Sequence, residues 1–211
     1  HREEHRPAPI QTVMRARIPF TPVVYEHAAR CVGRTPWEVS RDAELLFEAH
    51  RAAFLEYRQD VIAVGIDIYN LEAEAYGARV EAADGNAIPA IHEPLLDSPE
   101  DGHHLPPFDP ARAGRIPMAL AVGQRLKREF PEADVRIPVA GPFSIAFNLC
   151  GITRLCEDAI LRPEATARLL LRLAENQAEF CRAVAKAGLD IAFFESAAAP
   201  PLLSPRQFHQ L

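Results

Sequence analysis

The chain has 211 residues, of which 48% are hydrophobic and 25% are charged, the balance of an ordinary globular domain. Its 29 acidic and 23 basic residues give a net charge of -6 and are intermixed, which argues against a nucleic-acid-binding surface. No window approaches the ~18 apolar residues of a membrane span, and the charged N-terminus lacks the apolar stretch of a signal peptide. We therefore expect a cytoplasmic protein with neither nucleic acid nor membrane as a partner.

The first part of the chain alternates β-prone runs with helix signals. Residues 20–24 predict a short strand, and Thr35-Pro36-Trp37-Glu38 has the form of a capping box that opens an amphipathic helix. The apolar run of residues 61–66 predicts a strand buried on both faces, which ends at Asp67. A short helix near residues 71–76 and a further strand at 79–81 complete this part.

A long segment rich in Pro, Gly, Asp and His spans residues 84–114 and shows no period. It is longer than the ~12–15 residues usual for loops in compact domains, so we interpret it as a functional loop, a lid over a site.

The remaining chain repeats the alternation. The predicted elements, in order, are a helix over 117–130, a strand over 134–140, a short helix from Gly141-Pro142, a long helix over 163–187, a strand over 190–194 and a helix opened by Ser204-Pro205.

This order implies parallel strands joined by crossover helices, an α/β fold. Because no strand is followed by Gly-x-Gly-x-x-Gly, a (β/α)8 TIM barrel is favoured over a dinucleotide-binding sheet. Only five or six strand-helix units can be counted, whereas a whole barrel needs ~250 residues. We interpret residues 1–14 as an N-terminal extension and 15–211 as the N-terminal two-thirds of a single barrel domain whose C-terminal part is missing.

Active sites of such barrels lie at the carboxyl ends of the strands. The polar residues at predicted strand ends are Tyr25, Glu26, His27, Asp67, Tyr69, Asn70, Glu72, Ser144, Asn148, Glu195 and Ser196. Carboxylates at this position can bind a cation or a polar ring, or they can cap the helices that follow. For Ser144 and Asn148 we favour capping, whereas for Asp67 both interpretations stay open.

Common metal and nucleophile motifs are absent: no His-x-Cys, Cys-x-x-Cys, His-Glu-x-x-His or Gly-x-Ser-x-Gly occurs. Cys150 and Cys156 have apolar neighbours and are predicted to be core thiols, and His103-His104 is predicted to be a solvated pair.

Four motifs in order resemble the uroporphyrinogen decarboxylase superfamily. They are Asp60-Val-Ile-Ala-Val-Gly-Ile-Asp67-Ile with Glu72-Ala-Glu-Ala-Tyr-Gly77, then Gly141-Pro-Phe-Ser-Ile-Ala, then Gly188-Leu-Asp-Ile, and Ser204-Pro-Arg-Gln-Phe208. The resemblance spans residues 15–211 and implies a (β/α)8 barrel with a deep cleft at the strand ends. It also implies a longer chain.

The superfamily contains tetrapyrrole decarboxylases, which need no cofactor, and methyltransferases, which use a methylated corrinoid and zinc. The arginine motif that grips substrate carboxylates in the decarboxylases is replaced here by His27-Ala-Ala-Arg30-Cys31. Asn148 stands where the decarboxylases have a tyrosine, whereas Asp67 and Ser196 match the family pattern. The residues of these motifs also resemble the methyltransferase branch more closely than the decarboxylase branch.

The resemblance therefore favours a corrinoid-dependent methyltransferase that moves a methyl group to a thiol or similar acceptor. The residues expected to line the substrate or corrinoid cleft are Asp67, Glu72, Glu195, Ser196, His27 and Asn148. Zinc ligands would lie beyond Leu211, so no metal site is assigned within this chain. The partner would be a corrinoid protein or a small tetrapyrrole.

Two alternatives stay open. A tetrapyrrole decarboxylase would need Arg30 or Arg34 to replace the missing clamp. A non-catalytic barrel fragment that binds a tetrapyrrole would expose apolar edges and is expected to form a homodimer or to aggregate.

Overall fold

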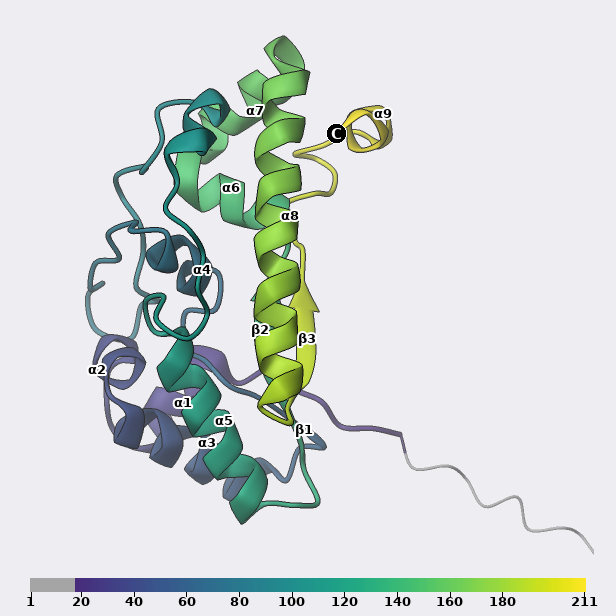
Figure 1. The fold of residues 1–211 in the computed structure, drawn as a ribbon. Coiled ribbons are helices and arrows are strands. Elements are labelled where there is room, and N and C mark those ends of the chain that lie inside the picture. The colour runs from purple at the N-terminus through teal and green to yellow at the C-terminus, as the bar shows by residue number, and fades with distance from the viewer. Residues whose placement is uncertain (1–17) are drawn as a thin grey trace, which may run out of the picture.

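The computed structural model describes residues 18–211 (Figure 1). Its elements in chain order are α1 (Tyr25–Cys31), α2 (Pro36–Arg41), α3 (Ala43–Tyr57), β1 (Val61–Ala63), α4 (Asn70–Ala75), the 3₁₀ helix η1 (Pro99–His104), α5 (Ile116–Glu129), β2 (Asp134–Ala140), α6 (Pro142–Cys150), α7 (Ile152–Leu161), α8 (Pro163–Lys186), β3 (Asp190–Phe194) and α9 (Pro205–Gln210).

The three strands form one parallel sheet in the order β1-β2-β3. Val61 pairs with Asp134, and Arg136 pairs with Asp190. Since parallel neighbours need a crossover, each connection contains helices, as the alternating pattern predicted. The described residues thus form an α/β sheet of the kind that makes up part of a barrel wall, not a closed barrel.

Helices α3, α5 and α8 cover one face of this sheet. The side chains at this contact are almost wholly buried: Phe47, Ile62, Leu126, Ile137 and Phe180. The opposite face carries the half-buried Ala63, Arg136 and Ala192. The face under the helices is closely packed at β1 and β2 and opens at β3, where Phe193 is exposed, and the other face is partly open.

A second apolar cluster lies beyond the carboxyl ends of the strands, where α4, α6, α7 and α8 meet (Figure 1). Its fully buried members include Ile145, Leu149, Leu155 and Leu173. Helix α8 is long enough to run along both clusters, so it joins the sheet to the helices that surround the strand ends.

The helix signals are confirmed, with two divisions that the pattern did not show. Thr35 caps α2 through the predicted capping box with Glu38. The helix then breaks at Asp42, whose extended backbone ends α2 and whose side chain accepts from the N–H of Leu45 to begin α3. A second break at Gly151, which has a φ of 77°, separates α6 from α7.

Three strand predictions need correction. Residues 20–24 form no strand: Pro22 cannot donate to a ladder, and Phe20 is tied only to Asp60. Residues 79–81 make a single antiparallel bridge, Glu81 to Ala90, and no strand. The predicted strand 61–66 ends at Ala63, after which the chain turns toward Asp67.

The loop of residues 84–114 is fastened to the helices. Asn70 of α4 donates to the carbonyl oxygen of Pro89 over 2.6 Å, the N–H of Leu96 donates to Leu149 of α6, and Arg172 of α8 donates to the carbonyl oxygen of Leu105. The loop packs along these helices.

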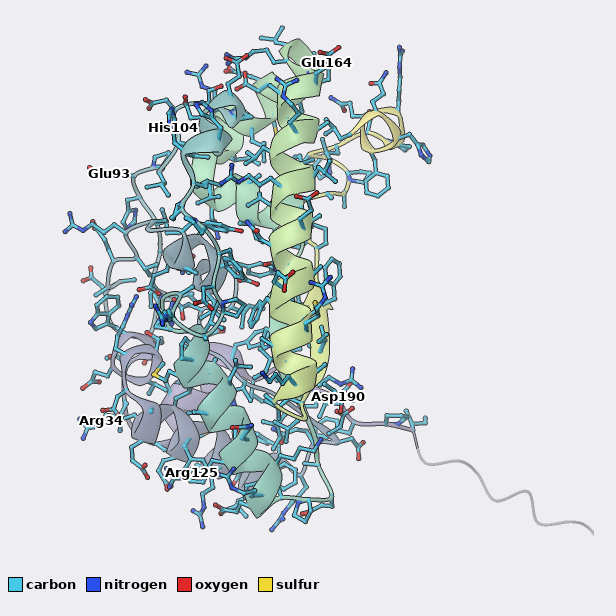
Figure 2. All side chains as sticks on the ribbon, viewed as in Figure 1. Arg34, Glu93, His104, Arg125, Glu164 and Asp190 are labelled. Atoms are coloured by element: carbon cyan, nitrogen blue, oxygen red, sulfur yellow. The ribbon has the colours of Figure 1, made fainter. Side chains whose placement is uncertain are left out.

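Charged side chains lie mainly at the periphery, as Arg34, Arg125 and Glu164 show (Figure 2). Within residues 18–211, no helix combines the length and the apolar character that crossing a bilayer requires.

Candidate functional site

The carboxyl ends of the strands open into a cavity of about 260 Å³, which we call the strand-end cavity. It is lined by Tyr69, Ser144, Phe147, Asn148, Ser196, Ala197 and Leu202. Tyr69 follows β1, residues 144–148 lie on the helix that follows β2, and residues 196–202 follow β3. All three strands therefore contribute to it, as the barrel architecture predicts.

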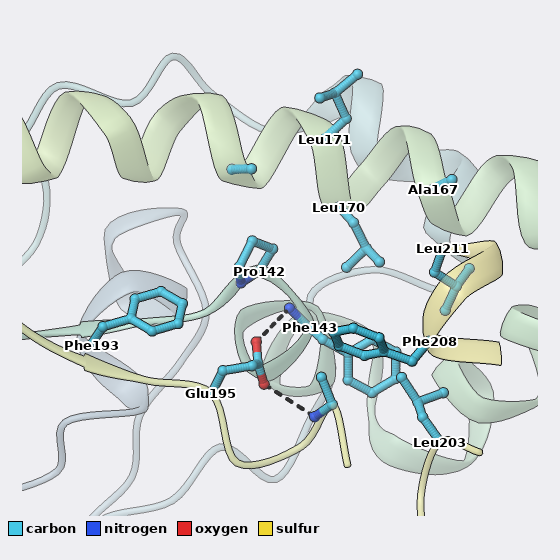
Figure 3. Close-up of a pocket in the computed structure, with 12 residues that line it drawn as sticks. Pro142, Phe143, Ala167, Leu170, Leu171, Phe193, Glu195, Leu203, Phe208 and Leu211 are labelled. Carbon is cyan, nitrogen blue, oxygen red and sulfur yellow. Dashed lines mark hydrogen bonds between the residues drawn. The ribbon is translucent and has the colours of Figure 1, made fainter. Parts of the chain in front are cut away.

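Glu195 connects two of the segments that form this cavity, the start of α6 and the turn after β3. Its Oε2 accepts from the N–H groups of Phe143 (3.0 Å) and Ser144 (3.2 Å), and its Oε1 accepts from the Ser144 hydroxyl (2.6 Å). The N–H groups of Ala197 and Ala198 also donate to Oε1, each over 3.2 Å, and Figure 3 shows the contact between Glu195 and Phe143. The carboxylate thus caps α6 and closes the turn after β3.

The close approach of Glu195 explains the glycine before α6. A Cβ atom at Gly141 would lie 2.1 Å from Oε2 of Glu195, closer than any two such atoms can come. Only glycine leaves room for the carboxylate at this helix start.

Asn148 and Tyr69 form the second polar wall. The side-chain amide of Asn148 donates to the carbonyl oxygen of Tyr69, which joins α6 to the chain that follows β1. Nearby, the Tyr25 ring lies 5.8 Å from the Phe194 ring at the end of β3. The Tyr25 hydroxyl is buried without a partner among the described residues, and burial raises its pKa well above the usual range.

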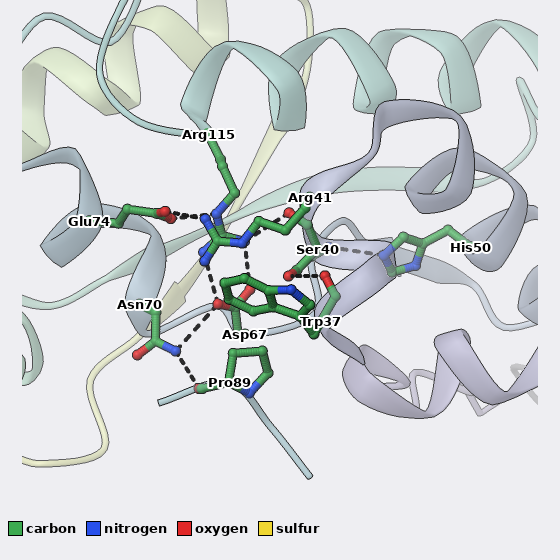
Figure 4. Close-up of polar contacts among 10 residues, drawn as sticks. Trp37, Ser40, Arg41, His50, Asp67, Asn70, Glu74, Pro89 and Arg115 are labelled. Carbon is green, nitrogen blue, oxygen red and sulfur yellow. Dashed lines mark hydrogen bonds and ion pairs between the residues drawn. The ribbon is translucent and has the colours of Figure 1, made fainter. Parts of the chain in front are cut away.

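Asp67 lies outside the strand-end cavity, in a buried ion-pair network between α2, α4 and α5. Its two carboxylate oxygens accept from Arg115 over 2.7 and 2.8 Å, and Arg115 also pairs with Glu74 (Figure 4). Arg41 pairs with the same Glu74 and stacks 4.3 Å from the centre of the Trp37 ring. The structure therefore gives Asp67 a bidentate internal partner.

Glu72 is wholly buried between the end of β2 and α8. Its Oε1 accepts from the N–H of Ala140 (2.8 Å) and from the side-chain amide of Gln177 (3.0 Å), while Oε2 has no partner among the described residues. Burial raises the pKa of this carboxyl to about 7. Glu72 thus joins two elements behind the cavity.

His27 lies on the exposed side of α1, where its Nε2 is 2.8 Å from the Tyr57 hydroxyl of α3. Among residues 18–211, no group of three or more His, Cys, Asp or Glu side chains is placed to hold a metal ion. His103 and His104 are exposed, as predicted for a solvated pair.

A larger cavity of about 470 Å³ lies on the other side of Glu195, between α8 and β3 (Figure 3). Its other lining residues are apolar and include the exposed Phe193 and Phe208. Because its single polar group is already engaged by backbone N–H donors, this cavity offers little for a polar reaction. The strand-end cavity is the better candidate site.

Of the six residues predicted to line the cleft, Asn148 and Ser196 line the strand-end cavity, and Glu195 lies directly behind Ser144. Asp67, Glu72 and His27 lie elsewhere. No residue of the 84–114 loop lines this cavity, so the structure does not support a lid there.

Ser144 was predicted to cap a helix, and Phe147 was not predicted as a site residue. A usable signal was present, because positions 144, 147 and 148 share one face of a helix that begins at a strand end.

The lining of the strand-end cavity is electrically neutral. It consists of three hydroxyl groups, one side-chain amide, two aromatic rings and two aliphatic side chains. Such a surface binds by stacking and by uncharged hydrogen bonds, whereas carboxylate groups are preferentially bound by arginine and lysine.

Comparisons with known proteins agree with this fold. A sequence model described as uroporphyrinogen decarboxylase matches residues 10–211. A solved structure, a methyltransferase from Methanosarcina mazei, aligns with a TM-score of 0.78 and 22% sequence identity, covering 92% of this chain and 59% of that chain. This chain therefore spans less than two-thirds of that structure. A search of curated proteins found no match.

Proposed function

The chain belongs to the uroporphyrinogen decarboxylase family, and from this premise we propose that it serves the transfer of a methyl group from a methylated corrinoid to a thiol or a similar acceptor. The observation that carries the proposal is the neutral lining of the strand-end cavity. The fold shared with a methyltransferase from Methanosarcina mazei supports it.

The cavity suits a corrinoid better than a polycarboxylate. A corrin ring carries amide side chains around an apolar rim, and such groups match hydroxyl, amide and aromatic partners. A porphyrinogen with several carboxylates needs cationic partners to offset the loss of hydration. Arg30 and Arg34, which could have supplied them, are exposed on α1 and beside the start of α2, and Arg34 pairs with Glu38.

In this proposal the residues of the chain bind and orient. Ser144, Asn148 and Ser196 would hold polar groups at the ligand rim, and Tyr69 and Phe147 would contact its apolar part. A bound methylcorrinoid would supply the methyl group. No step is assigned to zinc, because the described residues form no cluster that fits it.

A tetrapyrrole decarboxylase is the second candidate, and the description of the matching family model favours it. One experiment separates the two: the purified protein is incubated either with methylcobalamin and a thiol or with uroporphyrinogen, and the products are measured. We expect thiol methylation, with loss of rate in Asn148→Ala and Ser196→Ala but not in Arg79→Gln, a variant of an exposed side chain.

Decarboxylation without methyl transfer would overturn the proposal. Corrinoid binding without either reaction would favour the non-catalytic alternative.

A further inference from the structure

We infer that the wall of the strand-end cavity formed by Ser144 and Asn148 is a subsite for an uncharged hydrogen-bond donor of the ligand, a primary amide, and that Glu195 is the positioning residue that makes Ser144 an acceptor there. The inference rests on the proposed function, since a corrin ring is the ligand that would bring such amides to the cavity.

The Ser144 hydroxyl has a fixed direction. Its single proton is donated to Oε1 of Glu195 over 2.6 Å, and its oxygen receives the N–H of Ala197 over 3.4 Å. A hydroxyl oxygen has one proton and two acceptor positions, so Ser144 can only accept from a group in the cavity. Ser144 is 4% exposed, which limits competition from bulk water.

Asn148 lies four residues further along α6. Its amide nitrogen is engaged with the carbonyl oxygen of Tyr69, which fixes the orientation of the side chain. No group among residues 18–211 donates to its amide oxygen. Because residues at this spacing lie on one helix face, Ser144 and Asn148 present two acceptors side by side.

Glu195 is held in place by its hydrogen bonds. Five hydrogen-bond donors converge on its two oxygens, from the start of α6, the Ser144 hydroxyl and the turn after β3. Gly141 supplies the space in which the carboxylate lies. A carboxylate accepts and cannot donate, so it holds the Ser144 proton away from the cavity. Glu195 therefore acts through Ser144 and need not touch the ligand.

These contacts predict selection by hydrogen-bond donors and not by charge. A ligand whose primary amides are replaced by methyl esters keeps its shape, its carbonyl groups and its neutrality, but it brings no N–H to the two acceptors. Leaving buried acceptors unpaired is costly, and sites built to bind a donor discriminate strongly against analogues that lack it.

The test compares two corrinoid probes by direct binding, followed through the corrin absorption spectrum. Dicyanocobinamide carries primary amides at its rim, and dicyanocobyrinate heptamethyl ester has the same ring with ester groups in their place. We expect the wild-type protein to prefer the amide ring by about tenfold or more, as for one lost hydrogen bond in a water-poor site.

Two variants test the role of Glu195. In Glu195→Gln the side-chain amide can donate as well as accept, so Ser144 can turn its proton into the cavity, and the preference should fall several-fold. Ser144→Ala should lose the same preference by removing the acceptor. Glu175→Gln, on the exposed face of α8, is the matched control and should keep it.

Thermal unfolding of each variant separates a folding defect from altered binding. A merely structural role of Glu195 would weaken both probes equally, whereas the inference requires a change in their ratio. If both rings bind the wild-type protein equally well, the inference is overturned and the corrinoid function stands. If neither ring binds, both the proposed corrinoid function and the inference are overturned.

Discussion

Replacement of Glu72 by glutamine is expected to stabilise the protein at neutral and alkaline pH. Glu72 is wholly buried, receives two hydrogen bonds on one oxygen and has no positive partner among the described residues. Burial disfavours the charged form, and its pKa is raised to about 7. Glutamine reproduces the neutral form without a charge to desolvate.

The direction of the pH dependence follows from the pKa of Glu72 in the unfolded chain and in the folded chain. Below the ordinary carboxyl pKa of 4.5, Glu72 is protonated in both the folded and the unfolded chain, and its favourable contribution is fully present. Between 4.5 and about 7 the unfolded chain loses the proton and the folded chain keeps it, so the free energy of unfolding falls as the pH rises. The difference between these two pKa values corresponds to about 3 kcal/mol in the free energy of unfolding, and above about pH 7 this stability has been lost.

The assay is urea unfolding of wild-type protein and of Glu72→Gln at pH values from 4.5 to 8. The difference between their free energies of unfolding cancels every other titrating group. We expect this difference to move in favour of the variant by about 2–3 kcal/mol across the range. Glu175→Gln, an exposed substitution on α8, should show no such trend.

A difference that does not vary with pH would refute the reasoning. A wild-type protein that gains stability over the variant as the pH rises would show that the carboxylate form is the one the fold favours.

Three further changes test the ion-pair network, the glycine at α6 and the capping box by urea unfolding. Arg115→Met leaves the buried Asp67 carboxylate without its bidentate partner and should cost about 3–5 kcal/mol, part of which Asp67→Asn in the same chain should restore; a loss below about 1 kcal/mol would contradict a buried pair. Gly141→Ala drives a Cβ into Glu195 and should cost about 1–3 kcal/mol, whereas an unchanged midpoint would show that the carboxylate can move freely. Thr35→Ala removes a helix cap and should cost about 1 kcal/mol, and a neutral result would mean that the α2 start is held by packing alone.

The elements that sequence patterns predicted best are those whose signals are local. Residues 134–140 and 190–194 are strands as predicted, and the long helix begins at Pro163 and ends one residue before the predicted Ala187. The hydrophobic pattern of each element and its start and stop signals lie within its own segment, so the local sequence is enough to predict the element. Strand pairing is not local, and residues 20–24 remained irregular although their composition favours a strand.

The site was only partly predictable for the same reason. The rule that polar residues at strand ends form the site selected Asn148 and Ser196, and both line the strand-end cavity. It could not show that Asp67 is paired by Arg115, 48 positions away, or that the start of α6 is capped by Glu195 and not by Ser144. Both facts depend on side chains from distant segments, which no spacing rule contains.

The fastening of the 84–114 loop at Pro89, Leu96 and Leu105 divides one long segment into several short spans. Because the entropy of closing a loop grows only with the logarithm of its length, each short span can accept inserted residues at little cost while the fastened points hold their places. The exposed span at residues 85–88 would therefore be a suitable position for an inserted peptide tag or a spectroscopic label, remote from the strand-end cavity in its contacts. The length of this loop is thus better understood as tolerance to variation than as a moving part.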